Sequence, residues 1–398
     1  MVLERLTGPL AGPTATAEAG GQSLSRGAAG IALWHLERAH HHDPGARQRA
    51  HAWVRAALTE PVSNAGTAGL FAGLPAITFL LHTAEPVIPD YHRAVQECDA
   101  HLIRLAHHRV DAAMARIDNG EPAAFAEYDL LRGLTGIGQV LLKFRPGTDA
   151  LARVLRYLVR LTEPLHLDGE TVPGWWVGHD PDPLLPTPGG HTNLGLAHGI
   201  AGPLALLATA MRLGITVDGH REAMDTISAH LDRWRHTTGT GNWWPYWINR
   251  RDHARGHIAQ LHPGRPSWCY GTPGIARAQQ LAALATNDAH RQHAAETALA
   301  ACLADPAQLR MISDVGLCHG WAGLYHTAAR AAVDAHSPAL RSHLPYLASL
   351  LAQHAEATEP PEHAFLDGAA GIALALSGIT DDAATAPRSG WDACLLIA

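Results

Sequence analysis

A short glycine element followed by an apolar run recurs along the chain. The element has the form Gly-x-x-Gly, and each copy precedes a stretch rich in Ala and Leu. Glycine permits tight turns and a close approach of neighbouring backbones, and the apolar run after it predicts a buried helix. The copies begin at Gly27, Gly73, Gly133, Gly199, Gly271, Gly320 and Gly368.

The spacing of these copies predicts one pair of helices in each repeat. Intervals near the two ends of the chain are close to 48 residues, which suits two helices and two loops, and the longer intervals predict insertions between the second and fifth repeats. The second copy is degenerate, with Ala76 in place of its second glycine. Between the elements, apolar positions follow a helical period, as in 339–357. Strand signals are weak throughout, so we expect an all-α fold.

The similarity between the first and last copies predicts that the repeats close into a ring. An open solenoid needs polar capping repeats at both ends, whereas GAAGIAL at 27–33 and DGAAGIAL at 367–374 are apolar and nearly identical. We therefore expect an α/α toroid of about 14 helices, seven in an inner ring and seven in an outer ring. We expect this toroid to form a single domain over residues 1–398. An open array of HEAT-like repeats is the alternative.

Composition excludes several classes of protein. Of 398 residues, 47% are hydrophobic and only 17% are charged, which excludes a disordered chain. The formal net charge of −7 and the lack of a Lys/Arg stripe argue against nucleic-acid binding. No apolar run approaches the roughly 20 residues that a membrane span needs, and no signal-peptide pattern precedes the first repeat. Five scattered cysteines suggest a reducing compartment with free thiols, so we expect a cytoplasmic protein.

The two residues before the first glycine of each copy form what we call the slot of that repeat. The fifth slot contains Cys269, and the sixth contains Cys318 and His319. In a ring, equivalent positions meet at one end of the axis, so these three side chains are expected to converge. Two thiolates and an imidazole suit Zn²⁺ and leave a fourth position open, as in catalytic zinc sites. The alternative is that both cysteines are small buried residues that pack a helix start.

Three further polar residues lie in or near neighbouring slots. His198 occupies the fourth slot, Asp129 lies four residues before Gly133, and Arg265 lies four residues before Cys269. They could supply an acid or base, a carboxylate that orients it, and a cation for developing negative charge. Taken singly, they could equally be a core histidine, a helix-start aspartate and a surface arginine.

Several strings resemble one known family. SWCYGTPG, LCHGWAGL, GLAHGIAG, EYDLLRGL and the C-terminal WDACLLIA are similar to the LanC-like proteins, in particular the stand-alone cyclases of class I lanthipeptides. The resemblance covers most of the chain and includes all seven glycine elements. It implies an α/α toroid with a central zinc. The residues it implies are zinc ligands at Cys269, Cys318 and His319, and active-site roles for Asp129, His198, Arg265 and Tyr270, with Trp268 nearby.

The resemblance also implies a reaction and partners. The reaction adds cysteine thiolates of a substrate peptide to dehydroalanine or dehydrobutyrine, which gives lanthionine and methyllanthionine thioether rings. The implied partners are a dehydrated precursor peptide of leader and core, a separate lanthipeptide dehydratase and a transporter, in a biosynthetic complex at the membrane periphery. Open alternatives are a zinc protein that binds thiols such as glutathione, a scaffold without cyclase activity, and a prenyltransferase-like zinc toroid, for which no basic diphosphate pocket is visible.

Tryptophan pairs and dense prolines mark the inserted region. Trp175 with Trp176, and Trp243 with Trp244, flank a Pro-rich stretch at 181–188. Rigid aromatic loops at a ring opening could line a peptide groove, or they could be packed connections between outer helices. The sequence leaves both interpretations open.

Overall fold

The computed structural model describes residues 2–13, 21–182, 184–239, 241–360, 362–380 and 386–398. The chain divides into two compact units, of which the first comprises Met1–Arg104 with Ile312–Ala398 and the second comprises Leu105–Met311. The first unit therefore contains repeats six, seven, one and two, and the second contains repeats three to five. That all seven repeats form one domain stays a prediction.

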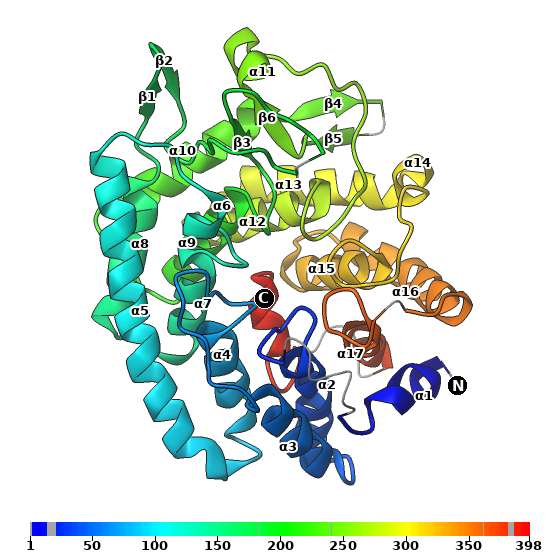
Figure 1. The fold of residues 1–398 in the computed structure, drawn as a ribbon. Helices are drawn as coiled ribbons and strands as arrows, with labels where there is room; N and C mark the ends of the chain where they lie inside the picture. The colour runs from blue at the N-terminus through cyan, green and yellow to red at the C-terminus, as the bar shows by residue number, and fades with distance from the viewer. Residues whose placement is uncertain (1, 14–20, 183, 240, 361, 381–385) are drawn as a thin grey trace. The chain divides into compact units, whose positions relative to one another are not determined.

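Seven helices begin at the seven glycine elements, which confirms the prediction of a helix after each copy (Figure 1). Their residues are buried along most of their length on every side. We call them the inner helices: α2 (Ala28–His40), α4 (Leu74–Ala84), α7 (Leu134–Phe144), α9 (Ala201–Arg212), α12 (Thr272–Thr286), α15 (Trp321–Asp334) and α17 (Ala369–Thr380).

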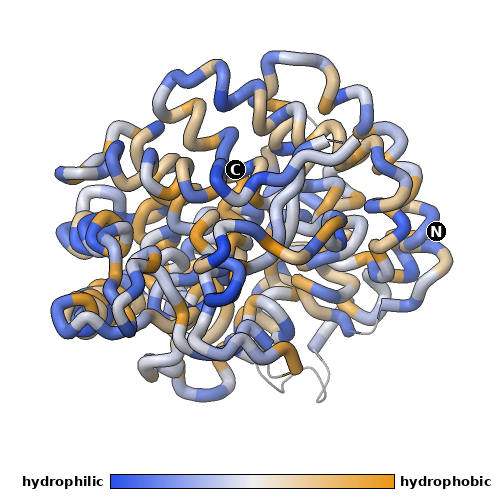
Figure 2. The backbone as a smooth tube through the Cα atoms, turned by 90° about the horizontal axis from the view of Figure 1, so that it is seen from above, coloured by the Kyte–Doolittle hydropathy of each residue, from blue (hydrophilic) through white to orange (hydrophobic). Residues whose placement is uncertain are grey.

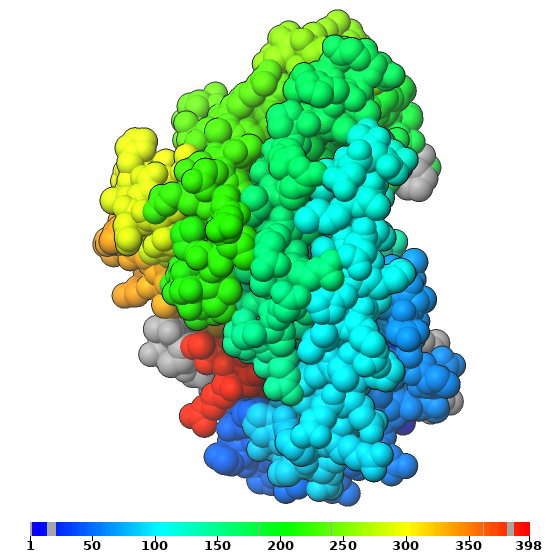
Figure 3. All heavy atoms as spheres, turned by 90° about the vertical axis from the view of Figure 1, so that its left-hand side faces the viewer, coloured from blue at the N-terminus to red at the C-terminus, as the bar shows by residue number. Residues whose placement is uncertain are grey.

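A second set of helices alternates with the inner ones along the sequence. These outer helices bury one face and expose the other, so that hydrophobic and hydrophilic stretches alternate along the backbone tube (Figure 2). In the second unit, α8 packs beside both α10 and the C-terminal half of α5 (Figure 3). The outer helices that follow an inner helix are α3 (Ala46–Ala57), α5 (His92–Asp118), α8 (Asp149–Arg160), α10 (His220–Arg233), α13 (Ala289–Ala304) and α16 (Ala339–Ala357).

The seventh pair combines the two ends of the sequence. Helix α17 packs against α1 (Val2–Thr7), which takes the place of an outer helix, and it also packs against α2 of the first repeat. The first and last repeats are therefore neighbours within the first unit, as ring closure requires. Helix α16 has the bounds that the helical period at 339–357 predicts.

Slots of successive repeats lie side by side within each unit, joined by main-chain hydrogen bonds. In each case an N–H group at or just before one slot donates to the carbonyl oxygen of the first residue of the next slot. The bonds in the first unit are Cys318 to Leu366 (3.0 Å), Leu366 to Ser25 (3.1 Å) and Leu24 to Phe71 (3.1 Å). Those in the second are Leu130 to Ala197 (3.1 Å) and Leu196 to Cys269 (3.0 Å).

This close pairing explains the second glycine of the element. A Cβ atom added at Gly371 would lie 1.8 Å from the carbonyl oxygen of Phe365, and one added at Gly323 would lie 1.9 Å from that of Leu317. In both cases the carbonyl belongs to the residue six positions earlier, in the turn or bend that contains the slot. A side chain at either of these two positions would displace the slot backbone, so the glycine is a packing requirement of the sixth and seventh repeats, whereas the second repeat carries Ala76 there.

The longer intervals contain small elements that the sequence did not predict. Three antiparallel pairs of three-residue strands lie here: β1 (Leu165–Leu167) with β2 (Glu170–Val172), β3 (His191–Asn193) with β6 (Trp247–Asn249), and β4 (His236–Thr238) with β5 (Gly241–Trp243). Strands this short carry too few residues to show an alternating pattern. The remaining short α-helices are α6 (Phe125–Tyr128), α11 (Arg250–Arg255) and α14 (Pro306–Leu309), and the 3₁₀ helices are η1 (Gly8–Leu10), η3 (Pro89–Tyr91) and η4 (Trp391–Leu395).

The tryptophan pairs of this region belong to the core. Trp175, Trp176, Trp243 and Trp244 are all buried. Three of their indole N–H groups donate hydrogen bonds within the second unit, for example Trp244 to the carbonyl oxygen of Leu231 at 2.8 Å. These four side chains are therefore packed connections and do not line a groove. None of the described helices combines the length and the apolar character that crossing a bilayer requires.

Candidate active site

Asp129 lies in the turn between α6 and α7 and is fully buried. Its Oδ1 atom accepts hydrogen bonds from the main-chain N–H groups of Arg132 at 2.6 Å and Gly133 at 2.8 Å. These bonds fix the side chain within its own turn. The other carboxylate oxygen, Oδ2, is thereby directed away from the turn.

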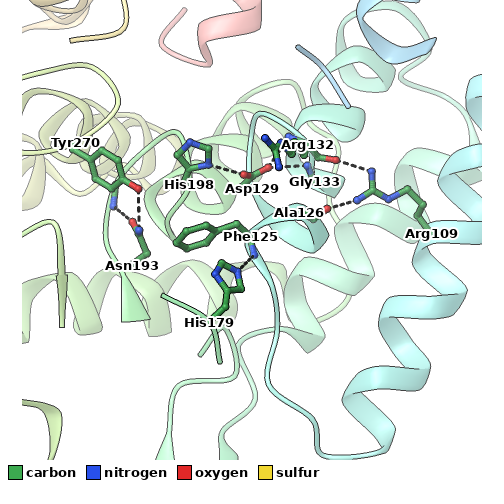
Figure 4. A network of polar contacts seen from close by, with 11 residues as sticks. Arg109, Phe125, Ala126, Asp129, Arg132, Gly133, His179, Asn193, His198 and Tyr270 are labelled. Carbon is green, nitrogen blue, oxygen red and sulfur yellow. Dashed lines mark hydrogen bonds and ion pairs between the residues drawn. The ribbon is translucent and has the colours of Figure 1, made fainter. Parts of the chain in front are cut away.

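That second oxygen meets His198 from the neighbouring repeat. The distance between Asp129 Oδ2 and His198 Nδ1 is 2.7 Å (Figure 4). A carboxylate can only accept, so Nδ1–H donates and Nε2 is the nitrogen that can exchange a proton with a substrate. The His198 side chain is 29% exposed, and the ring of Phe125 lies 5.6 Å from it between centroids. The pair therefore combines a buried carboxylate, that of Asp129, with an accessible imidazole, that of His198.

Tyr270 lies beside this pair and is held by a residue that the sequence analysis missed. Asn193, at the end of β3, donates from Nδ2 to the Tyr270 hydroxyl oxygen at 3.1 Å, and its Oδ1 accepts the N–H of Gly195 at 3.0 Å (Figure 4). The Tyr270 and His198 rings are 6.2 Å apart between centroids. Asn193 therefore sets the position of the phenol relative to the imidazole.

A spacing in the sequence could have identified Asn193. It lies six residues before Gly199, and Asp314 lies six residues before Gly320. The two side chains form equivalent hydrogen bonds, because Asp314 Oδ1 accepts the N–H of Gly316 at 3.0 Å, as Asn193 Oδ1 accepts that of Gly195. In the fourth and sixth repeats, the sixth position before the first glycine thus holds a polar side chain that accepts the N–H group two residues further on.

Arg265 precedes the fifth slot and is half-buried. Its carbonyl oxygen accepts the hydroxyl of Tyr246 at 2.8 Å, and the Tyr246 ring packs 5.3 Å from Tyr270 between centroids. Burial raises the pKa of Tyr246 to about 12, while the Arg265 charge opposes that rise. The Arg265 Nε atom is buried, and it has no hydrogen-bond partner among the described residues. It is therefore a donor that a negatively charged group could use.

The three predicted zinc ligands belong to different units. Cys269 is buried in the second unit, with its Sγ atom 3.5 Å from the Ser267 hydroxyl, and Trp268 beside it is completely buried. Cys318 and His319 lie half-buried in the first unit, at the start of α15. That these three residues form one metal site stays a prediction.

Carboxylates lie close to both ring nitrogens of His319. Nε2 is 3.4 Å from Asp314, and Nδ1 is 3.9 Å from Asp367. A metal-bound histidine usually directs its second nitrogen at a carboxylate or carbonyl group. The surroundings of His319 therefore suit a histidine that uses one nitrogen for a metal ion and the other for an acidic partner.

The remaining thiols have surroundings that suit packing and not metal binding. Burial raises the pKa of the Cys98 thiol to about 11 and raises that of Cys302 further above its ordinary value. The Cys302 thiol donates to Gln308 at 3.2 Å, and the Cys394 thiol donates to the Trp391 carbonyl oxygen at 3.1 Å. A metal ligand must be a thiolate, and burial that raises the pKa of the Cys98 and Cys302 thiols opposes that form.

Comparison with known proteins agrees with this architecture. Nisin cyclase has a solved structure that superposes on the chain with a TM-score of 0.83 at 19% sequence identity, covering 100% of this chain and 96% of the other. This likeness confirms the predicted all-α fold class, the α/α toroid. No curated protein matches the chain. The model of the lanthionine synthetase C-like proteins matches residues 18–396. Because that match spans nearly the whole chain, the protein belongs to the lanthionine synthetase C-like family.

Proposed function

We propose that the protein is a zinc-dependent lanthipeptide cyclase. It closes thioether rings by adding cysteine thiolates of a dehydrated peptide to dehydroalanine or dehydrobutyrine. The observation that carries the proposal is the 2.7 Å contact between buried Asp129 and accessible His198, in a chain of the LanC-like family. An oriented imidazole is the group that a thiol addition needs, because the reaction takes a proton from sulfur and returns one to carbon.

Cys269, Cys318 and His319 would hold the zinc ion. Support comes from their shared slot position, from a donor set of two thiols and one imidazole, and from the carboxylates beside His319. When bound, zinc supplies positive charge that lowers the pKa of a substrate thiol. With these three residues as ligands, the ion would still be able to take up a substrate thiol.

His198 would transfer the proton from sulfur to carbon. Its Nε2 atom accepts the proton of the substrate thiol, and Asp129 stabilises the resulting imidazolium through Nδ1–H. The sulfur lone pair forms a bond to the β-carbon of the dehydro residue. The electrons of the broken carbon–carbon π bond move onto the α-carbon and its carbonyl group as an enolate. His198 returns the proton to the α-carbon, so that the thiol hydrogen ends on carbon and the total mass is unchanged.

Arg265 and Tyr270 would act on the enolate. The buried Arg265 Nε–H has no hydrogen-bond partner among the described residues, and a donor held in place is most effective where charge develops. The Tyr270 hydroxyl, held by Asn193, would offer a second donor near His198, whose ring lies 6.2 Å from that of Tyr270 between centroids. These two groups stabilise charge, while His198 moves protons.

The substrate would be a precursor peptide of leader and core that a separate dehydratase has already dehydrated. The chain contains no G-x-x-x-x-G-K-[ST] nucleotide loop, and the seven repeats account for most of its length. A transporter would follow in the pathway. We propose that the protein acts in the cytoplasm, at the periphery of a membrane-associated complex.

Metal analysis of purified variants tests the ligand assignment. We expect one zinc per chain in the wild type, strong loss in Cys318→Ala, and retention in Cys302→Ala, a buried thiol outside the slots. We also expect His198→Ala to keep zinc and to leave the cysteines of a dehydrated precursor open to alkylation. Full zinc occupancy in Cys318→Ala would refute the assignment. Zinc loss in His198→Ala would instead make that histidine a ligand.

A further inference from the structure

The turn that carries Asp129 is braced by an arginine from an outer helix. Arg109 on α5 donates from Nη1 to the carbonyl oxygen of Arg132 at 2.6 Å and from Nη2 to the carbonyl oxygen of Ala126 (Figure 4). These two carbonyls lie three residues before and three residues after Asp129. One guanidinium group therefore bridges both ends of the segment that presents the carboxylate.

The bridge is coupled to the carboxylate through a single peptide unit. This unit is the Arg132–Gly133 peptide: its N–H, from Gly133, donates to Asp129 Oδ1 at 2.8 Å, while its carbonyl oxygen, from Arg132, accepts from Arg109. A shift of this peptide would rotate the carboxylate and move Oδ2 away from His198. Burial lowers the pKa of the Arg109 guanidinium, and the Asp129 charge acts in the opposite direction, so the two groups also interact electrostatically.

A second arginine on the same helix provides a natural comparison. Arg116 forms a two-point contact with the carboxylate of Glu127, at 2.6 and 3.0 Å, and the Tyr157 hydroxyl donates to the same carboxylate at 2.7 Å. Arg116 thus anchors α6 through a side chain, and its third hydrogen bond goes to the carbonyl oxygen of Glu121, outside the Asp129 turn. Both arginines tie α6 to α5, but only Arg109 holds the peptide that orients Asp129.

We propose that Arg109 is a positioning residue of the cyclisation reaction, which fixes the Asp129 carboxylate in the orientation that holds His198. This inference rests on the proposed function and adds a residue to it. Lysine cannot replace the planar guanidinium here, because one ammonium group cannot donate to two separated carbonyls with the same geometry. The inference therefore predicts that Arg109→Lys is damaging while Arg116→Lys is not.

Steady-state cyclisation of a dehydrated precursor peptide separates these roles. For zinc-loaded Arg109→Lys we expect kcat to fall on the order of 10- to 100-fold, since a small misplacement of a catalytic group has effects of this size, with KM within about twofold of wild type. The matched Arg116→Lys variant should lower the urea midpoint but change kcat by no more than about twofold. Equal kcat values in the two variants would overturn the inference.

A proton resonance gives a second readout that needs no turnover. The His198 Nδ1–H proton, hydrogen-bonded to Asp129, should give a downfield signal in ¹⁵N-histidine-labelled protein that is absent in His198→Ala. We expect it to broaden or vanish in Arg109→Lys and to persist in Arg116→Lys. Persistence in Arg109→Lys would overturn the positioning role. If the two variants differ in this signal but the wild-type protein forms no thioether, the proposed function fails while the structural role of Arg109 stands.

Arg109→Ala provides a further test, because it leaves space for a small guanidinium compound. Adding methylguanidinium should restore the His198 signal and part of kcat in this variant, while methylammonium should restore neither. Equal effects of the two cations would show that Arg109 contributes only charge, which contradicts the bridging role.

Discussion

Replacing Gly371 by Ala should destabilise the protein by about 3 kcal/mol or more. The new Cβ atom would lie 1.8 Å from the carbonyl oxygen of Phe365 and 2.7 Å from Cδ1 of Leu317. Carbon and oxygen atoms in contact need more than 3 Å, so the slot backbone would have to move by over 1 Å. Over-packing a core costs roughly 1–3 kcal/mol, and an obstacle made of main chain places this change at the upper end.

The same helix contains a matched control. Gly378 also lies in α17, but a Cβ atom added there meets nothing within 4 Å. Gly378→Ala should therefore stabilise by up to about 1 kcal/mol, the ordinary gain of helix propensity. The two substitutions should therefore change the free energy of unfolding in opposite directions, which distinguishes the cost of over-packing from the gain in helix propensity.

Urea unfolding, monitored by helical circular dichroism, measures both effects. With a slope of about 3 kcal/mol/M, Gly371→Ala should lower the midpoint by about 1 M or more, while Gly378→Ala raises it slightly. An unchanged or raised midpoint in Gly371→Ala would refute our explanation of the second glycine. The repeat would then need another physical reason for it.

Three other outcomes follow from the contacts of the second unit. Asp129→Asn should keep zinc and fold, but lower kcat strongly because the amide no longer fixes the Nδ1–H form of His198; near-normal kcat would contradict this. Zinc-loaded Arg109→Lys and Arg116→Lys should differ in kcat but both lose stability, as unfolding and cyclisation assays together would show. Burial, with a smaller effect of a neighbouring imidazole, lowers the pKa of His191 from 6.5 to about 4. The unfolded chain therefore binds a proton first, and stability should fall by about 3 kcal/mol as the pH drops from 6.5 to 4. His191→Leu should flatten that part of a pH series of urea midpoints, and an unchanged slope would show that other groups cause it.

The inner helices could be predicted from sequence because their signal is local. A glycine element with an apolar run directly after it marks each helix start, and seven copies remove the ambiguity of one. Helix α16 could also be predicted from sequence, since its apolar positions follow one helical period for 19 residues. The likeness of the first and last copies also predicted that these two repeats are neighbours, and α17 packs against α2 within the first unit.

Other parts depend on contacts that no local pattern encodes. Arg109 lies on an outer helix outside every glycine element, and only the folded chain brings its guanidinium to the Asp129 turn. The partner of α17 is α1, a six-residue helix at the other end of the sequence. Asn193 could have been found in part from sequence, because its spacing to Gly199 matches that of Asp314 to Gly320. Its role in holding Tyr270 is visible only in the folded chain.

The central claim is that this chain forms thioether rings and that His198 carries the proton. The most direct measurement counts alkylatable cysteines by mass spectrometry, after a dehydrated precursor peptide has been incubated with zinc-loaded protein. We predict that wild-type protein protects the cysteines without a change in peptide mass. The His198→Ala variant, with its zinc intact, should leave them all open to alkylation. Free cysteines after incubation with the wild type would contradict the account and favour a thiol-binding or scaffold role. Protection by His198→Ala equal to that by the wild type would remove His198 from the mechanism.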